Sequence, residues 1–194
     1  MSVWCVLLLA GLATAEDKPW VAGKSAHAGF AARGSALMRL GAGEATVISD
    51  PNAKEITVTT ETKGGEKQSE IKTDIKVTGT YAEIHVDGPN NGFRYKITLP
   101  TAARLKVRMS AGDLNISGVD GDLDVELHAG DCGIQLGTGA ENFGPVDLSV
   151  KAGDVTAAPF NAEKSGLFRH FRNDKASKYR FHAHVGAGDL TVKN

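Results

Sequence analysis

The side chains with the clearest chemical pattern are aspartates that follow a glycine at a regular interval. Asp113, Asp122 and Asp131 each follow a glycine, and successive members are nine residues apart. If two nine-residue units form one coil of 18 residues, Asp113 and Asp131 occupy equivalent places in successive coils. They then stack about 4.8 Å apart, the usual spacing between strands. A Ca²⁺ ion would remove the repulsion between these carboxylates, which makes them candidate metal ligands. The alternative is that they accept hydrogen bonds from turn N–H groups.

A second candidate metal site is the pair His182 and His184. Residues two apart on a strand project to the same face, so both imidazoles could reach one metal ion. A strong site needs three or four ligands, and no nearby residue in the sequence completes the set. Two outward-facing histidines in water are therefore the alternative interpretation.

Aromatic and basic residues alternate in the segment 166–175, which includes Phe168, Arg169, Phe171 and Arg172. This composition is typical of segments that touch anionic polymers or lipid headgroups, so these four residues are candidate partner contacts. Alternatively the segment is a loop or short helix, in which rings three residues apart share one face and cover the core. The segment interrupts a repeat described below, as part of an insertion over 161–177.

No catalytic residue is assigned from the sequence. Nucleophile elbows, phosphate-binding glycine loops and zinc-protease motifs do not occur in it. Cys132 falls on an inward-facing position next to a glycine, which indicates a small core residue. The carboxylates of Asp124, Glu126 and Asp147 are expected on one outward face, where a carbohydrate-active β-helix enzyme would place its acids. We expect a protein that is not an enzyme, because no pocket-forming pattern accompanies these carboxylates.

The elements that position these residues are strands. Three nine-residue segments, AGDLNISGV, DGDLDVELH and AGDCGIQLG, follow one another over 111–137. Their fourth, sixth and eighth positions are mostly apolar and the intervening positions mostly polar. This alternation predicts strands of about five residues, each followed by a Gly-Asp turn. The pattern resumes at 143–160 and 178–194, and more loosely at 34–48.

Two arrangements suit such a unit. One is a parallel β-solenoid in which two units form a coil of 18 residues, and the other is an antiparallel β-sandwich or meander. The coil brings Lys106 beside Asp124 and Arg108 beside Glu126, because each pair is 18 residues apart. Such opposite charges on neighbouring strands contribute about 0.2–1 kcal/mol each. The pairs favour the solenoid, and the antiparallel arrangement stays open.

The N-terminus predicts export. Residues 1–15 are largely apolar and end in Ala-Thr-Ala before a polar stretch, which is typical of a signal peptide cleaved after Ala15. A bilayer-spanning helix needs about 20 apolar residues, so we expect no transmembrane segment in the mature chain, residues 16–194. We expect those residues to form one elongated domain in the periplasm, on the cell surface or in the medium. Cys132 is then the single remaining cysteine and can form no internal disulfide.

Charge excludes a general affinity for nucleic acid. The chain has 22 basic and 23 acidic residues and a formal net charge of −1. A nucleic-acid-binding domain ordinarily carries a clear positive excess.

The segment 97–131, ITLPTAARLKVRMSAGDLNISGVDGDLDVELHAGD, resembles the putative-adhesin family of exported bacterial proteins. Chains of that family repeat a Ser/Ala-Gly-Asp-apolar-x-apolar unit after a strand that ends in Leu-Pro. The resemblance is good over 97–194 and loose over 34–86. It implies a right-handed parallel β-solenoid at the cell surface or in the envelope, and it brings no catalytic residues or cofactor.

Together these observations predict a non-enzymatic, exported structural or adhesin-like protein that presents sheet surfaces to an envelope or surface component. An anionic polymer or a protein would suit the segment around Phe168. Self-association through the edge of the terminal strand near Val192 is a further expectation. The alternatives are a calcium-dependent β-roll module, in which Asp113 and Asp131 bind the ion, and a carbohydrate-active enzyme.

Overall fold

The computed structural model describes residues 18–194, so the expected signal peptide lies outside the described residues. The described chain is all-β, as predicted, with three short 3₁₀ turns: η1 Gln68–Glu70, η2 Ala140–Asn142 and η3 Ala158–Phe160. None of its helices has the length and apolar character needed to cross a lipid bilayer. The strands are β1 Trp20–Ala22, β2 Ala26–Gly29, β3 Ser35–Asp50, β4 Glu55–Lys63, β5 Lys72–Thr78, β6 Tyr81–Asp87, β7 Phe93–Pro100, β8 Arg104–Val119, β9 Asp122–Ala129, β10 Cys132–Leu136, β11 Phe143–Ala157, β12 Ala162–Asn173, β13 Tyr179–Ala187 and β14 Leu190–Lys193.

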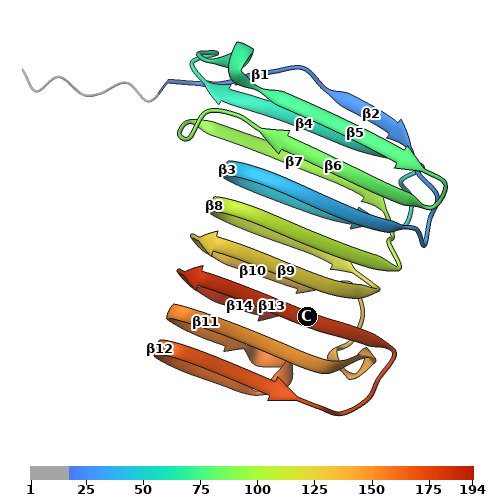
Figure 1. Cartoon of the computed structure of the whole chain (residues 1–194), viewed down its shortest axis with the longest axis vertical. Coiled ribbons are helices and arrows are strands. Elements are labelled where there is room, and N and C mark those ends of the chain that lie inside the picture. The colour runs from blue at the N-terminus through green and yellow to red at the C-terminus, as the bar shows by residue number, and fades with distance from the viewer. Residues whose placement is uncertain (1–17) are drawn as a thin grey trace, which may run out of the picture.

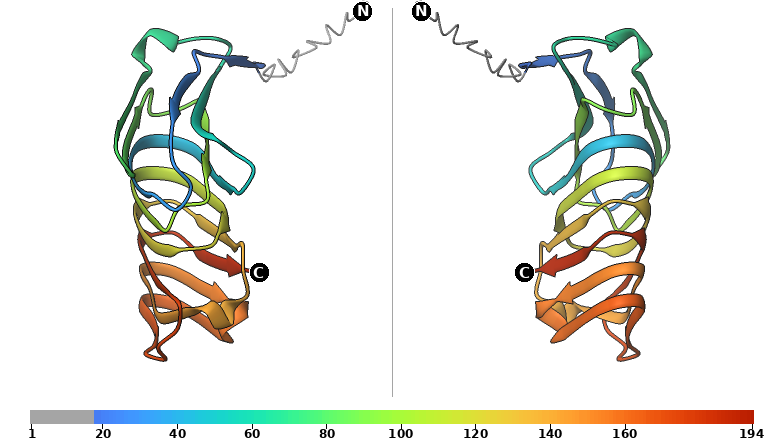
Figure 2. Two further views of the ribbon diagram at one scale, coloured as in Figure 1. Left: turned by 90° about the vertical axis from the view of Figure 1, so that its right-hand side faces the viewer. Right: turned by 90° about the vertical axis from the view of Figure 1, so that its left-hand side faces the viewer.

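Six strands form a closed ring at the centre of the sheet. β8, β10, β14, β11, β13 and β9 are hydrogen-bonded in that order, β9 pairs back with β8, and every pair is parallel. The long strands β8 and β11 bend, so that each belongs to two walls. The first half of β8 pairs with β9 and its second half with β10. The walls lie one behind the other in Figure 1 and are seen edge-on in Figure 2.

The predicted right-handed parallel β-solenoid is wrong, and so are the sandwich and meander alternatives. A regular solenoid stacks its strands in chain order, whereas β13 and β14 lie between the β9–β10 layer and β11. The C-terminal segment thus closes a six-stranded parallel barrel, with additional strands outside it. On one side β3 pairs with β8, followed by β6 and β7 and then the antiparallel strands β4, β5, β1 and β2. On the other side β12 runs antiparallel to β11 (Figure 1).

The predicted alternation of core and surface residues is confirmed. Leu123, Val125 and Leu127 of β9 are buried, while the carboxylates between them face outward. Cys132 is also buried, and this burial raises the pKa of its thiol to about 12. The cysteine therefore behaves as a core residue. Other predicted core residues that the structure buries are Leu105, Val107, Met109, Ile134 and Leu136.

The bends between the walls depend on stacked glycines. Gly130 has a φ of +118°, and a Cβ added there would lie 2.1 Å from the carbonyl oxygen of Gly112 on the neighbouring strand. Only glycine avoids both the unfavourable dihedral and the collision with backbone. The repeated Ala-Gly-acid sequence is thus the signature of a bend between two walls. Its glycines, in spatial order, are Gly43, Gly112, Gly130, Gly188 and Gly153.

The terminal strand is internal to the sheet. β14 pairs with β10 on one side and β11 on the other, so the unpaired edge expected near Val192 is not found there. Along residues 18–194, β12 pairs only with β11, and at the other end of the sheet β5 pairs only with β6.

Candidate functional site

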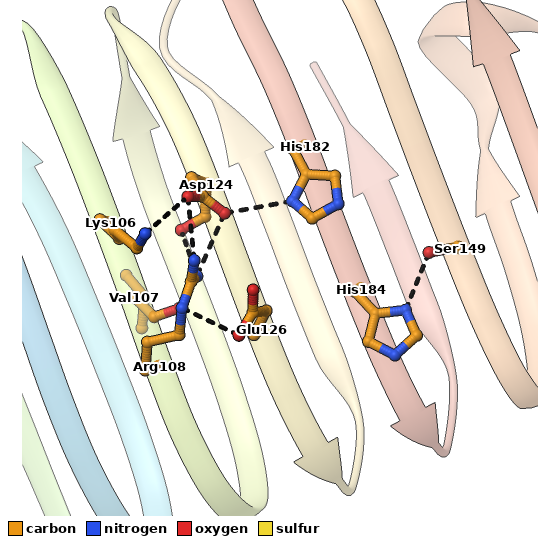
Figure 3. Close-up of polar contacts among 8 residues, drawn as sticks. All are labelled: Lys106, Val107, Arg108, Asp124, Glu126, Ser149, His182 and His184. Carbon is orange, nitrogen blue, oxygen red and sulfur yellow. Dashed lines mark hydrogen bonds and ion pairs between the residues drawn. The ribbon is translucent and has the colours of Figure 1, made fainter.

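The wall formed by β9, β13 and the first halves of β8 and β11 carries a row of charged and imidazole side chains, here called the histidine face. The parallel register places Asp124 between Lys106 and His182, and Glu126 between Arg108 and His184. The predicted neighbours Lys106–Asp124 and Arg108–Glu126 are confirmed by ion pairs of 3.4 Å and 2.9 Å. Figure 3 shows these side chains on one surface of the sheet.

Asp124 is the centre of this network. Its carboxylate accepts hydrogen bonds of 3.1 and 3.0 Å from the two Nη atoms of Arg108, and Nδ1 of His182 lies 3.1 Å away (Figure 3). Partial burial alone would raise the pKa of Asp124. The hydrogen bonds from Arg108 and His182, and the charges of Arg108 and Lys106, outweigh burial and lower that pKa to about 2. The carboxylate is therefore ionised at any physiological pH.

The two histidines share one face, as predicted, but they contact different partners. His182 contacts Asp124, whereas Nδ1 of His184 lies 2.9 Å from the Ser149 hydroxyl on β11 (Figure 3). Burial lowers the pKa of His184, and the charge of Lys151 adds to this effect. Within residues 18–194, no group of three or more His, Cys, Asp or Glu side chains is arranged to hold a metal ion. Metal binding by His182 and His184 stays a prediction.

The face continues onto β11 and β12. Asp147 lies opposite His182, so the expected alignment of Asp124, Glu126 and Asp147 on one outward face is confirmed. Nε2 of His170, on β12, lies 3.0 Å from Oδ1 of Asp147. Acidic groups thus alternate with basic or imidazole groups across the five strands β8, β9, β13, β11 and β12, and their mutual contacts leave the surface largely self-compensated.

At the bend, the aspartates of the repeat lie side by side. Asp113 on β8 lies beside Asp131, the residue that precedes β10, and the Asp131 carbonyl accepts a hydrogen bond of 2.8 Å from Leu114 N–H. The Asp131 carboxylate accepts a 2.9 Å hydrogen bond from Asp189 N–H, and the Asp189 carboxylate accepts one of equal length from Asp154 N–H. Two of these carboxylates therefore tie neighbouring strands together. Calcium binding at Asp113 and Asp131 stays a prediction.

The aromatic-basic segment is a strand, β12, and not a loop or short helix. Phe171 packs against Phe160, with ring centroids 6.4 Å apart, and so covers the end of the core. Phe168 does not cover the core: its side chain is 80% exposed, next to Leu167 at 65%. Arg172 contacts Asp174 at 2.6 Å, and both Arg169 and Arg172 are exposed.

Comparison with known proteins supports the fold alone. No family model and no curated protein sequence matches the chain. A solved structure from Clostridium sporogenes ATCC 15579, described as a putative cell adhesion protein, covers 88% of this chain and 98% of its own at 14% identity, with a TM-score of 0.51. The two chains share a fold. A structure from Parabacteroides distasonis ATCC 8503, described as a putative adhesin, covers 62% of this chain and 66% of its own at 12% identity, with a TM-score of only 0.25.

Sequence reasoning predicted Asp147 on this face but missed Ser149 on β11 and His170 on β12. Ser149 and His170 are distant in sequence from His184, and only strand pairing brings Ser149 next to both. The signal that could have found Ser149 is its place in the alternating pattern, two residues after Asp147. His170 lies in a segment without that alternation, and no comparable signal marks it.

Proposed function

We propose that this protein is a non-enzymatic, exported, adhesin-like protein that contacts an anionic component of the cell envelope through β12. The observation that carries the proposal is the pair Leu167 and Phe168, two large apolar side chains exposed in the middle of a basic strand. The fold shared with the Clostridium protein is compatible with such a role. The self-compensated histidine face favours a structural role for that wall.

The charge of this region fits an anionic partner. Residues 162–180 contain six basic and two acidic residues, a net charge of +4 in a chain of net charge −1. Basic side chains attract an anionic surface from a distance, and exposed apolar side chains add affinity on contact. The basic residues are Lys164, Arg169, Arg172, Lys175, Lys178 and Arg180.

The backbone at Phe168 supports a functional role. Its φ is +52°, a left-handed conformation that bulky residues rarely adopt and that costs roughly 1–3 kcal/mol. The conformation lies where β12 follows the bend of β11 at Ala152 and Gly153, and glycine would adopt it without strain. Selection for a protruding aromatic side chain would explain why glycine does not occupy this position.

The test is flotation of the protein with lipid vesicles, using vesicles rich in phosphatidylglycerol and vesicles of phosphatidylcholine alone. We expect binding to the anionic vesicles, and we expect both the R169E/R172E and the L167S/F168S variants to lose most of it. The matched control is K24E/K54E, which makes the same charge change at two exposed lysines outside this region.

Soluble polyphosphate as a competitor distinguishes recognition of phosphate groups from attraction to a charged lipid surface. Displacement by polyphosphate at constant ionic strength indicates recognition of phosphate groups. Equal binding by wild type and R169E/R172E would contradict the proposal. The same holds if K24E/K54E loses as much binding as R169E/R172E.

A further inference from the structure

The two walls of the barrel differ in how their outward polar side chains are used. On the histidine face these side chains contact one another. On the opposite wall, formed by β10, β14 and the second half of β8, the outward polar side chains have no hydrogen-bond partner within residues 18–194, and they continue onto β3. They are Thr46, Asn115, Ser117, Gln135, Thr191 and Lys193. Their donors and acceptors are open to solvent.

These side chains line a groove of 570 Å³. Gly133 lies at its centre, between Asn115 on β8 and Thr191 on β14, and its missing side chain leaves the hollow. Gly133 has no positive φ, and a Cβ added there would meet only Asn115, with Oδ1 at 2.7 Å. The backbone conformation at the bends requires glycine, whereas the backbone at position 133 does not. The glycine is therefore a feature of the surface and not a requirement of the fold.

The groove combines hydrogen-bonding side chains with accessible backbone, and its surface is about equally polar and apolar. Ile116, Cys132 and Ile134 contribute backbone to it, but their side chains are buried in the core. Both edges of β10 and β14 are already paired, so a peptide cannot add as another strand. Hydroxyl and amide side chains arrayed at the strand spacing suit a ligand rich in hydroxyl groups.

Charge at the rim narrows the ligand further. Asp113, Asp131 and Asp189 lie along the bend at one side of the groove, and Lys193 lies among the other lining residues. The nearest acidic groups outnumber the basic one, so an anionic polymer is disfavoured and amino groups are favoured.

We propose that this groove binds an oligosaccharide, either neutral or carrying amino groups, through Asn115, Gln135 and Thr191. The site is independent of the anionic contact proposed for β12, since it lies on a different surface and selects the opposite ligand charge. A shallow groove that forms mainly hydrogen bonds gives modest affinity, with contacts partly mediated by water.

The experiment is an NMR titration of the ¹⁵N-labelled protein with three probes: glucosamine tetrasaccharide, cellotetraose and tetragalacturonic acid. We expect saturable shifts of amides in β10, β14 and the second half of β8 with the first two probes. Glucosamine tetrasaccharide should bind tightest and the anionic probe should leave these amides unshifted. G133T introduces a strand-favouring residue whose side chain fills the hollow, so it should weaken binding roughly tenfold or more.

N115A/Q135A should weaken binding without filling the groove, and S110T, an exposed strand position on the other wall, should leave it unchanged. Shifts confined to the histidine face, or equal binding by G133T and wild type, would overturn the proposal, as would no saturable shift with any probe. Tighter binding of a polar tetrapeptide such as Asn-Thr-Ser-Gln in the groove would replace the saccharide assignment with a peptide one.

Discussion

Asp124 is the residue on which the histidine face depends, because Lys106, Arg108 and His182 all converge on its carboxylate. Its pKa lies below the ordinary value of 3.8, at about 2. A carboxylate with a lowered pKa stabilises the folded state above its ordinary pKa, and this stabilisation is lost as pH falls towards the folded-state value. The network therefore contributes fully at neutral pH and disappears in acid.

We accordingly expect Asp124→Asn to lower the free energy of unfolding at pH 7 by roughly 1–2 kcal/mol, since it removes charged hydrogen bonds that are partly exposed. The difference from wild type should shrink as pH falls from about 4 to about 2. Urea unfolding followed by circular dichroism at several pH values measures this. Asp174→Asn, which removes a more exposed pair with Arg172, should change stability little at any pH. A constant difference between wild type and D124N across this range would contradict the assigned cause.

Gly130 is a second position where one residue decides the structure. Ala would be held at a φ of +118° with its Cβ 2.1 Å from the Gly112 carbonyl oxygen, so Gly130→Ala should destabilise by roughly 2–4 kcal/mol. The matched control is Gly29→Ala, because no atom lies within 4 Å of a Cβ added at Gly29. Thermal unfolding of both variants compares them directly. Similar melting temperatures would mean that the bend tolerates a side chain.

Among the elements, strands with an alternating pattern could be predicted and β12 could not. Leu123, Val125 and Leu127 alternate with acidic residues. The apolar side chains must face the core and the acidic side chains must face solvent, so the pattern fixes the orientation of the strand. β12 has no such alternation, because it lies at the end of the barrel and most of its side chains are exposed. β12 is a strand because it pairs with β11 over nearly its whole length. Its own sequence pattern does not indicate this.

The two rings of β12 give a test of that placement. Phe171→Ala should destabilise by roughly 1–2 kcal/mol, since Phe171 is partly buried against Phe160 and covers the end of the core. Phe168→Ala should change stability by less than about 0.5 kcal/mol, because that ring is 80% exposed. Chemical denaturation of the two variants makes a matched comparison. A larger loss for F168A than for F171A would place the rings the other way round.

At the scale of the whole molecule, the sequence predicts that residues 18 apart lie on neighbouring strands, but it does not predict the closure of the barrel. Lys106 and Asp124 lie in consecutive units, and their opposite charges mark them as neighbours. No such pair of charges marks the position of β13 and β14 between β9–β10 and β11. Backbone hydrogen bonds form in the same way whatever the side chains are, so they do not indicate which strands are neighbours. The side-chain pairs that distinguish one neighbour from another, such as Asp124–His182, contribute only about 0.2–1 kcal/mol each.

Closure of the ring makes the last strand essential although it is only four residues long. β14 bridges β10 and β11, and both Leu190 and Val192 are fully buried. Deletion of residues 190–194 should therefore cost about 4 kcal/mol or more, a large part of the stability of an ordinary domain. Deletion of Asn194 alone, which is exposed and outside β14, should cost almost nothing. Urea unfolding of the two truncated proteins measures the difference. Equal midpoints would mean that β10 and β11 are held in place without β14, and the ring would then be open in solution.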